Sequence, residues 1–218
     1  MHADCPPSNS SPASLKRRAA YVLAAGAVAA VPAGESDGAV VYSGAQNIAI
    51  GSGFSQNVDL NGDAQNDILL KNFNFGGGPY QGATVNFAPG KVVGFNNGLA
   101  YVSALSAGAL IDGMTAGPGF FGSMAYGAAN PNAQFNNVTD AYVGLTFPSG
   151  ANTYYGWIRV DVNNAAKTFL IKDWAYESQS GVGIKAGDGL VPEPATLGLL
   201  ACGAAGIAAM RRRRVAAA

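Results

Sequence analysis

Apolar and polar side chains alternate over many short stretches in the middle of this chain, and no stretch keeps an apolar period of 3.6 residues. Alternation of this kind predicts β-strands. Gly, Asn and Pro clusters separate the stretches and favour turns. Many short strands with such spacing predict a mainly β fold, an antiparallel β-sandwich-like domain. The expected strands cover residues 39–42, 48–50, 54–60, 68–73, 83–87, 92–95, 100–105, 140–147, 154–162, 168–177 and 183–185.

Residues 154–177 form the clearest unit, a β-hairpin with a turn at 163–166. In its first strand Tyr155 and Trp157 share one face, and Ile158 lies on the other. Trp174 and Tyr176 follow in the second strand. Two interpretations stay open for these four aromatic residues: a platform on which sugar rings stack, or core packing, the commoner role of aromatics in sandwich interiors.

The N-terminal part has the order of a secretory signal peptide. Lys16-Arg17-Arg18 precede an apolar run at 19–31, and Pro32-Ala33 follow. A basic region, a short apolar region and small residues at the exit are the parts that signal peptidase recognises. We expect a signal peptide at 1–33. The alternative, a retained membrane anchor, is disfavoured because a spanning helix needs about 20 apolar residues.

The C-terminal part carries three features in sequence. Pro192-Glu193-Pro194 come first, an uncharged apolar run fills 195–210, and Arg211, Arg212, Arg213 and Arg214 follow. As a helix, the apolar run would span about 24 Å, and arginines at its end can snorkel to the interface. It therefore predicts a single transmembrane helix with the arginines in the cytoplasm. The prolines keep the motif extended and accessible to a processing enzyme.

This order of motif, helix and arginines resembles the PEP-CTERM sorting signal of Gram-negative bacteria. The resemblance covers Val191 to Arg214. It implies recognition by exosortase, an integral-membrane processing enzyme, and an association with exopolysaccharide and biofilm matrix. The chain then divides into a signal peptide (1–33), an exported β-rich domain (34–190) and a sorting signal (191–218). The alternative is a plain C-terminal membrane anchor.

Removing both ends changes the chemistry of what remains. Residues 34–191 hold six basic and eleven acidic side chains, and six minus eleven gives a net charge of −5. An acidic domain disfavours a nucleic-acid partner, because phosphate binding needs clustered Lys and Arg. His2, Cys5 and Cys202 all lie outside this range. The absence of His and Cys excludes Ser-His-Asp and Cys-His catalysis, a zinc site and a disulfide framework.

Carboxylates are the remaining candidates for catalysis. A glycosidase needs two of them about 5–9 Å apart across a cleft. Asp161, Asp173 and Glu177 share the hairpin and could approach one another, but we interpret them as surface acids paired with Lys or Arg. We therefore expect no enzyme.

One loop has the spacing of a calcium site. Asp59, Asn61, Asp63 and Asp67 occupy positions 1, 3, 5 and 9, and Gln65 at position 7 can add a backbone carbonyl. The loop resembles those of calcium-binding extracellular repeats. It departs from them at position 6, where Ala64 replaces the usual Gly, and at position 12, where Leu70 replaces an acid. The alternative is a polar turn between strands.

These features predict an exported protein of the cell surface or extracellular matrix. The first hypothesis is a structural or adhesive role with exopolysaccharide. The alternative is a calcium-assisted carbohydrate-binding module, which an aromatic face and a calcium loop would suit. The expected partners are signal peptidase and exosortase, the membrane before processing, and exopolysaccharide.

Overall fold

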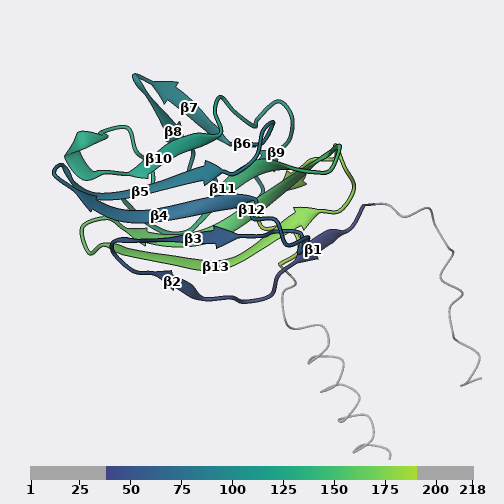
Figure 1. Cartoon of the computed structure of the whole chain (residues 1–218), viewed down its shortest axis with the longest axis horizontal. Coiled ribbons are helices and arrows are strands. Elements are labelled where there is room, and N and C mark those ends of the chain that lie inside the picture. The colour runs from purple at the N-terminus through teal and green to yellow at the C-terminus, as the bar shows by residue number, and fades with distance from the viewer. Residues whose placement is uncertain (1–37, 191–218) are drawn as a thin grey trace, which may run out of the picture. The chain divides into compact units, whose positions relative to one another are not determined.

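A computed structural model of the protein describes residues 38–190 (Figure 1). The expected signal peptide, the Pro-Glu-Pro motif, the apolar run and the arginine cluster lie outside the described residues. Within 38–190 no helix has the length and apolar character needed to cross a membrane. A short 3₁₀ turn, η1 (Gly127–Ala129), is the helical element of this range.

The longest strands belong to sheet A, which has six antiparallel strands in the order β1-β13-β12-β11-β6, with β2 also paired to β13. β11, β12 and β13 form a continuous meander, and β1 and β2 share the free edge of β13. The strands are β1 (Val40–Tyr42), β2 (Ile48–Ile50), β6 (Lys91–Val92), β11 (Asn137–Ser149), β12 (Asn152–Asn163) and β13 (Thr168–Glu177).

Sheet B also has six strands, in the order β3-β4-β5-β10-β8-β7. Its pairs are antiparallel except for the parallel contact between β10 and β8. A separate two-stranded ladder joins β9 (Leu110–Ile111) and β14 (Ile184–Lys185). The strands of sheet B are β3 (Phe54–Val58), β4 (Ile68–Phe75), β5 (Gly78–Val85), β7 (Gly94–Asn97), β8 (Leu99–Val102) and β10 (Phe121–Ala125).

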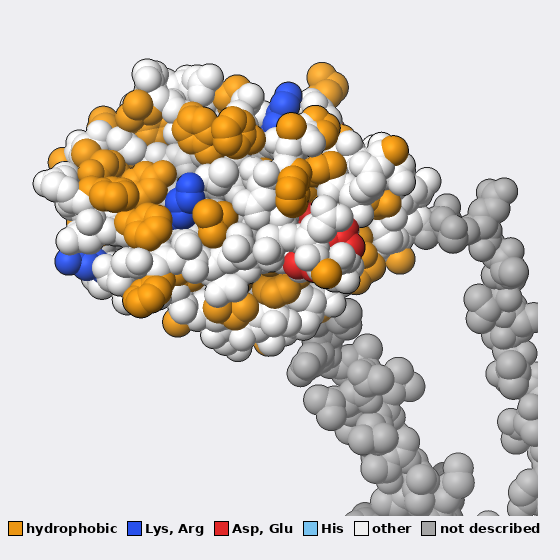
Figure 2. All heavy atoms as spheres, in the orientation of Figure 1, with side chains coloured by type: hydrophobic (Ala, Val, Ile, Leu, Met, Phe, Trp, Pro, Cys, Tyr) orange, Lys and Arg blue, Asp and Glu red, His pale blue; other side chains and the backbone are white. Residues whose placement is uncertain are grey.

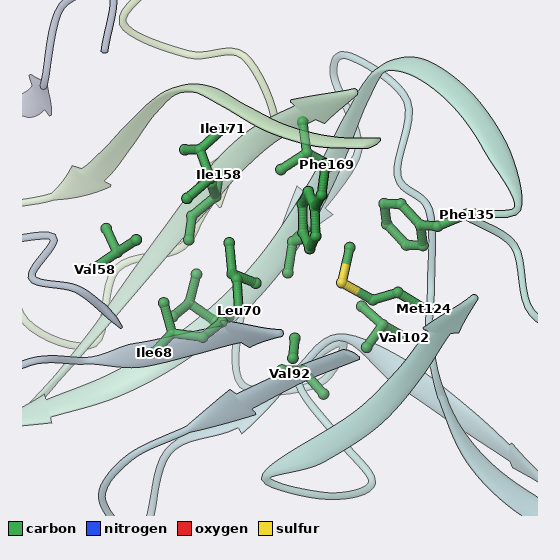
Figure 3. Packing of buried hydrophobic residues seen from close by; sticks show 14 of the residues in the cluster. Val58, Ile68, Leu70, Val92, Val102, Met124, Phe135, Ile158, Phe169 and Ile171 are labelled. Atoms are coloured by element: carbon green, nitrogen blue, oxygen red, sulfur yellow. The ribbon is translucent and has the colours of Figure 1, made fainter. Parts of the chain in front are cut away.

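The main core lies between the two sheets. Ile68 and Leu70 of β4 face Ile158 of β12 and Ile171 of β13 across it (Figure 3). The inward residues alternate with more exposed ones along β4, as expected of strands with one buried face. Burial of these aliphatic side chains stabilises the domain without any disulfide.

A second, smaller core lies on the opposite face of sheet A. Trp157 is its largest member, and Ile111 of β9 and Ile184 of β14 pack with it. The β9–β14 ladder therefore covers part of sheet A on the side away from sheet B. Both faces of the central strands of sheet A are buried as a result.

The prediction of a mainly β domain of antiparallel sheets is confirmed, and several strand bounds differ. The single strand expected at 92–95 is wrong: β6 ends at Val92 in sheet A, and β7 begins at Gly94 in sheet B. β5 begins at Gly78, five residues before the expected strand at 83–87, because Pro79 pairs with Asn74 in the hairpin with β4. β9 and β10 were not predicted. β9 has two residues, and buried Gly122 and Ser123 hide the alternation of β10.

Candidate functional site

The predicted calcium loop connects β3 to β4 and is held by its own carboxylates. Asp59 accepts hydrogen bonds from the backbone N–H groups of Gly62 (2.7 Å) and Ala64 (2.8 Å). Ala64 has φ +69°, a left-handed conformation that L-residues rarely adopt. The backbone thus makes at Ala64 the bend for which calcium loops use Gly.

A second carboxylate ties this loop to a neighbouring hairpin. Asp63 accepts hydrogen bonds from the backbone N–H of Gln65 (2.9 Å) and from the side chain of Asn61 (3.1 Å). It also accepts one from the hydroxyl of Ser149 (2.7 Å), at the turn between β11 and β12. These contacts hold the pKa of Asp63 below its usual value, with Ser149 the largest cause.

Asp67, the last acid of the loop, is buried, with 1% of its surface exposed. Its Oδ2 accepts a hydrogen bond from the backbone N–H of Leu60 (2.7 Å). Burial raises the pKa of Asp67 to about 7, and the charges of Asp59 and Asp63 add to the rise. The Leu60 N–H acts in the opposite direction.

The loop therefore has one left-handed residue at the position where calcium loops carry Gly, and its carboxylates already accept hydrogen bonds from N–H and hydroxyl donors. Among residues 38–190, no group of three or more His, Cys, Asp or Glu side chains is gathered as a metal-binding cluster. The hydrogen bonds fit the alternative of a polar turn as well. A calcium site at Asp59, Asn61, Asp63, Gln65 and Asp67 stays a prediction.

The four aromatic residues of the hairpin do not share one face. Trp157 pairs with Ala175, and Ile158 pairs with Trp174. Trp157 and Tyr155 lie in the smaller core, whereas Trp174 and Tyr176 pack against the main core on the other side of sheet A. A single platform of all four residues, one of the two interpretations of the sequence, is therefore wrong.

A β-bulge is the cause of this separation. The register shifts where Arg159 pairs with Asp173 and Val160 pairs with Ile171, which leaves Lys172 as the extra residue. One inserted residue moves every later side chain to the opposite face. Trp157 is fully buried, and its indole N–H donates to the carbonyl of Asp188 (3.1 Å). The core interpretation holds for Trp157 and Tyr155, since a buried ring has no face open to a sugar.

The acids of the hairpin are engaged in structural contacts. Asp173 is 1% exposed and receives a bidentate hydrogen bond from Arg159 and one from the hydroxyl of Tyr42. Glu177 is also buried, and accepts from the backbone N–H of Gln179. The expectation that both lie at the surface is wrong, because β1 covers this edge of β13. The expected pairing of an acid with Arg159 is confirmed for Asp173. Asp161 does pair with Lys172 (3.5 Å), as expected of a surface acid.

An aromatic surface that the sequence analysis missed lies on sheet B. It consists of Phe73 and Phe75 of β4, Tyr80 of β5, and Tyr126. The ring centroids of Phe75 and Tyr80 are 5.7 Å apart, and those of Tyr80 and Tyr126 are 5.4 Å apart. Phe75 is 52% exposed. Since Ile68 and Leu70 face the core, the alternating Phe73 and Phe75 point to the outer face of sheet B.

Two signals could have located this surface. Phe73 and Phe75 are two residues apart, and the turn at Gly76-Gly77 brings Tyr80 opposite Phe73. Lys71 lies on the same face and donates to the hydroxyl of Thr84 (2.9 Å).

Hydrophobic side chains are widespread on the face of the domain shown in Figure 2, whereas acidic side chains gather in one place.

An open pocket of about 490 Å³ lies beside the loop between β5 and β6. Its walls are mostly apolar and include Pro89, Pro118 and Phe120. Lys91 is the single ionisable residue among those that line it. The pocket thus offers no pair of titratable groups for acid–base chemistry.

The end of the domain is a short segment, Ile184–Leu190, which we call the C-terminal clasp. Ile184 pairs with Ile111, and the backbone of Ala186 exchanges hydrogen bonds with Ala109 and Gly108 (both 2.8 Å). Leu190 packs against the smaller core. In Figure 1 the first and last parts of the coloured ribbon meet near β1, where Gly189 lies against Val40.

Comparison with protein families finds a PEP-CTERM protein-sorting motif at residues 190–214. This is a β domain followed by a sorting tag: the chain carries a PEP-CTERM sorting domain, as predicted from Pro192–Pro194 and the arginines. The motif marks an exported bacterial protein that exosortase processes, with a destination at the cell surface or outside the cell. No curated protein and no solved structure matches the chain.

Proposed function

We propose that the exported domain is a non-enzymatic structural or adhesive protein of the extracellular matrix that associates with exopolysaccharide. The observation that carries this proposal is the aromatic surface on sheet B. Sugar rings present apolar C–H faces that stack on aromatic rings. Phe75, Tyr80 and Tyr126 form neighbouring rings on the outer face of a rigid sheet, and Lys71 adds one positive charge nearby.

The state of the carboxylates supports a role without catalysis. Asp173 is held by Arg159, and Glu177 is held by a backbone N–H. A glycosidase needs one carboxyl group free to give a proton and a second free to attack or to activate water. Neither buried acid has that freedom while these contacts persist.

Binding of the secreted protein to exopolysaccharide from its producing cells tests this proposal. We expect Phe75→Ala and Tyr126→Ala each to weaken binding by about tenfold, since stacking on one ring contributes about 1–1.5 kcal/mol. Phe54→Ala is the matched control, because Phe54 is 69% exposed and lies outside the aromatic surface. Equal losses in all three variants, or no loss in any, would contradict the proposal.

A calcium-assisted carbohydrate-binding module is the second candidate. It is favoured by the left-handed Ala64, which follows the path of a calcium loop, and by the contact of Asp63 with Ser149. Calcium would take up the carboxylates of Asp59 and Asp63 and so fix the β3–β4 loop against the β11–β12 hairpin. Calorimetric titration with CaCl₂ tests this. Heat and a rise in melting temperature that Asp59→Asn abolishes would support it, and the absence of both would exclude it.

We also propose two processing events during export of the precursor. Signal peptidase removes residues 1–33, and the apolar run at 195–210 holds the precursor in the inner membrane of a Gram-negative cell until exosortase acts. The mature termini, measured by mass spectrometry, test both steps. A surface-exposed form that still ends in Arg211–Arg214 would contradict processing.

A further inference from the structure

The sorting motif begins inside the folded domain. The matched region starts at Leu190, which packs against the smaller core of sheet A. One residue, Val191, separates Leu190 from Pro192. Since an extended chain covers at most about 3.6 Å per residue, Pro192 lies within about 7 Å of the Cα of Leu190 in any conformation.

Such a short connection restricts access to the motif. An extended peptide is recognised through main-chain hydrogen bonds and side-chain pockets along several residues, and a processing enzyme that binds the motif in this way also needs the residues before it. On the N-terminal side of Pro192 those residues belong to the C-terminal clasp, with β1 directly beside it. The residues before the motif are therefore engaged by the folded domain and are not free to extend into an enzyme.

The two halves of the clasp are held with different strength. The first half, Ile184–Ala186, pairs with β9 and its neighbours, and both Ile184 and Ala186 are 2% exposed. The second half, Gly187–Leu190, has no strand partner. It is attached through the indole of Trp157, which donates to the carbonyl of Asp188, and through the side chain of Leu190.

Release of the second half alone would change the reach of the motif. Ala186 would become the last anchored residue, with five residues between it and Pro192. The motif could then extend about 20 Å from the sheet. Openings of this size, confined to a chain end with few buried contacts, cost much less free energy than global unfolding.

We propose that exosortase processes the form of the precursor in which Gly187–Leu190 has detached from sheet A, so that this segment controls the rate of sorting. Gly187–Leu190 is a positioning segment: while attached to sheet A it is not available as extended chain before the motif, and when detached it supplies those extended residues. The rate of processing then follows the population of the open form.

A disulfide that locks the segment provides the first test. A Cβ placed on Gly189 would lie 3.6 Å from the Cβ of Val40, within the range that a disulfide requires. We expect membranes that contain exosortase to process the oxidised precursor with Val40→Cys and Gly189→Cys at least tenfold more slowly than the same precursor after reduction. Each single-cysteine precursor is a matched control, since Gly189→Cys alone carries the same strain at φ +86°. These controls also report disulfides formed with Cys5 or Cys202.

A flexible spacer provides the second test and requires no new bond. Six Gly and Ser residues inserted between Leu190 and Val191 remove the steric restriction and leave the clasp intact. We expect processing to become several-fold faster, and the cysteine pair to lose its effect when combined with the spacer. Processing of the locked precursor at the unlocked rate, or a spacer precursor that is processed no faster than the native one, would overturn the proposal. The wild-type precursor in the same membranes gives the reference rate and shows that exosortase stays active in the reductant.

Discussion

Two groups of aromatic residues in this domain look alike in sequence and differ in structure. Tyr155 and Trp157 lie on the central strand β12 of sheet A, under the β9–β14 ladder, and are buried. Phe73 and Phe75 lie on β4 of sheet B, where no further layer among the described residues covers the outer face, and Phe75 is half exposed. Alternation shows which residues share a face. It does not show which face a later segment covers.

The first group packs in the smaller core of the fold, whereas Phe75 of the second group is exposed to solvent. Mutations in the first group should therefore act on stability, and mutations in the second group on binding.

Trp157→Ala should have the largest effect. It removes a fully buried side chain together with the hydrogen bond to the carbonyl of Asp188. We expect the free energy of unfolding to fall by about 3–5 kcal/mol. Denaturant unfolding of the secreted domain measures this, and a loss below about 1 kcal/mol would mean that the second core does not form.

Arg159→Ala should follow. The guanidinium of Arg159 is the cation that pairs with the buried carboxylate of Asp173, and this contact raises the pKa of Arg159. Without Arg159, Asp173 is an unpaired buried charge, which costs about 3 kcal/mol of stability. Replacing both residues by apolar ones should restore part of the loss. A double variant that is no more stable than Arg159→Ala would show that the charge of Asp173 is not the cause.

Asp67 should make stability depend on pH. The pKa of Asp67 is about 7 in the folded domain and 3.8 for an unperturbed aspartate, so the folded state binds the proton more tightly. The free energy of unfolding should therefore decrease as pH rises from about 4 to about 7, by about 3 kcal/mol in the presence of a calcium chelator.

Asp67→Asn should remove most of that decrease. Asp112 provides a control in which the pH dependence has the opposite sign. Backbone N–H groups lower the pKa of Asp112, so its contribution to the free energy of unfolding is lost as pH falls. Melting curves between pH 4 and pH 8 compare the variants. A native domain whose stability does not change between pH 4 and pH 7 would contradict the buried, uncharged Asp67.

Phe75→Ala should have the smallest effect on stability, about 0.5 kcal/mol or less, because its ring is half exposed. The same variant should show the loss of exopolysaccharide binding described above. A destabilisation as large as that of Trp157→Ala would remove the distinction between the two groups.

The sequence predicted the class of fold because alternation and turn residues agree along the chain. The hairpin at 154–177 appeared with its expected turn, since Ala166 donates its N–H to the side chain of Asn163. The bulge at Lys172 was not predictable, because Phe169, Ile171 and Asp173 continue the alternation without a break. Burial of Asp173 also depends on β1, which is 131 residues away from it in sequence.

The sorting tag and the folded domain also differed in how much of each the sequence alone could predict. Pro192–Pro194 and Arg211–Arg214 are local signals that sequence alone reveals, and the family comparison confirmed them. The aromatic surface instead depends on pairing between β4 and β5 and on the position of Tyr126 after β10. Only the fold brings those rings together.

Tryptophan fluorescence during titration with exopolysaccharide tests the assignment of the two aromatic groups most directly. The chain has two tryptophans, Trp157 and Trp174, and both lie in the hairpin. We expect the polysaccharide to bind, as measured by calorimetry, with the emission of both tryptophans unchanged and with binding weakened by Phe75→Ala. A shift or quenching of tryptophan emission that saturates with the polysaccharide would place the glycan on the hairpin and contradict the aromatic surface on sheet B.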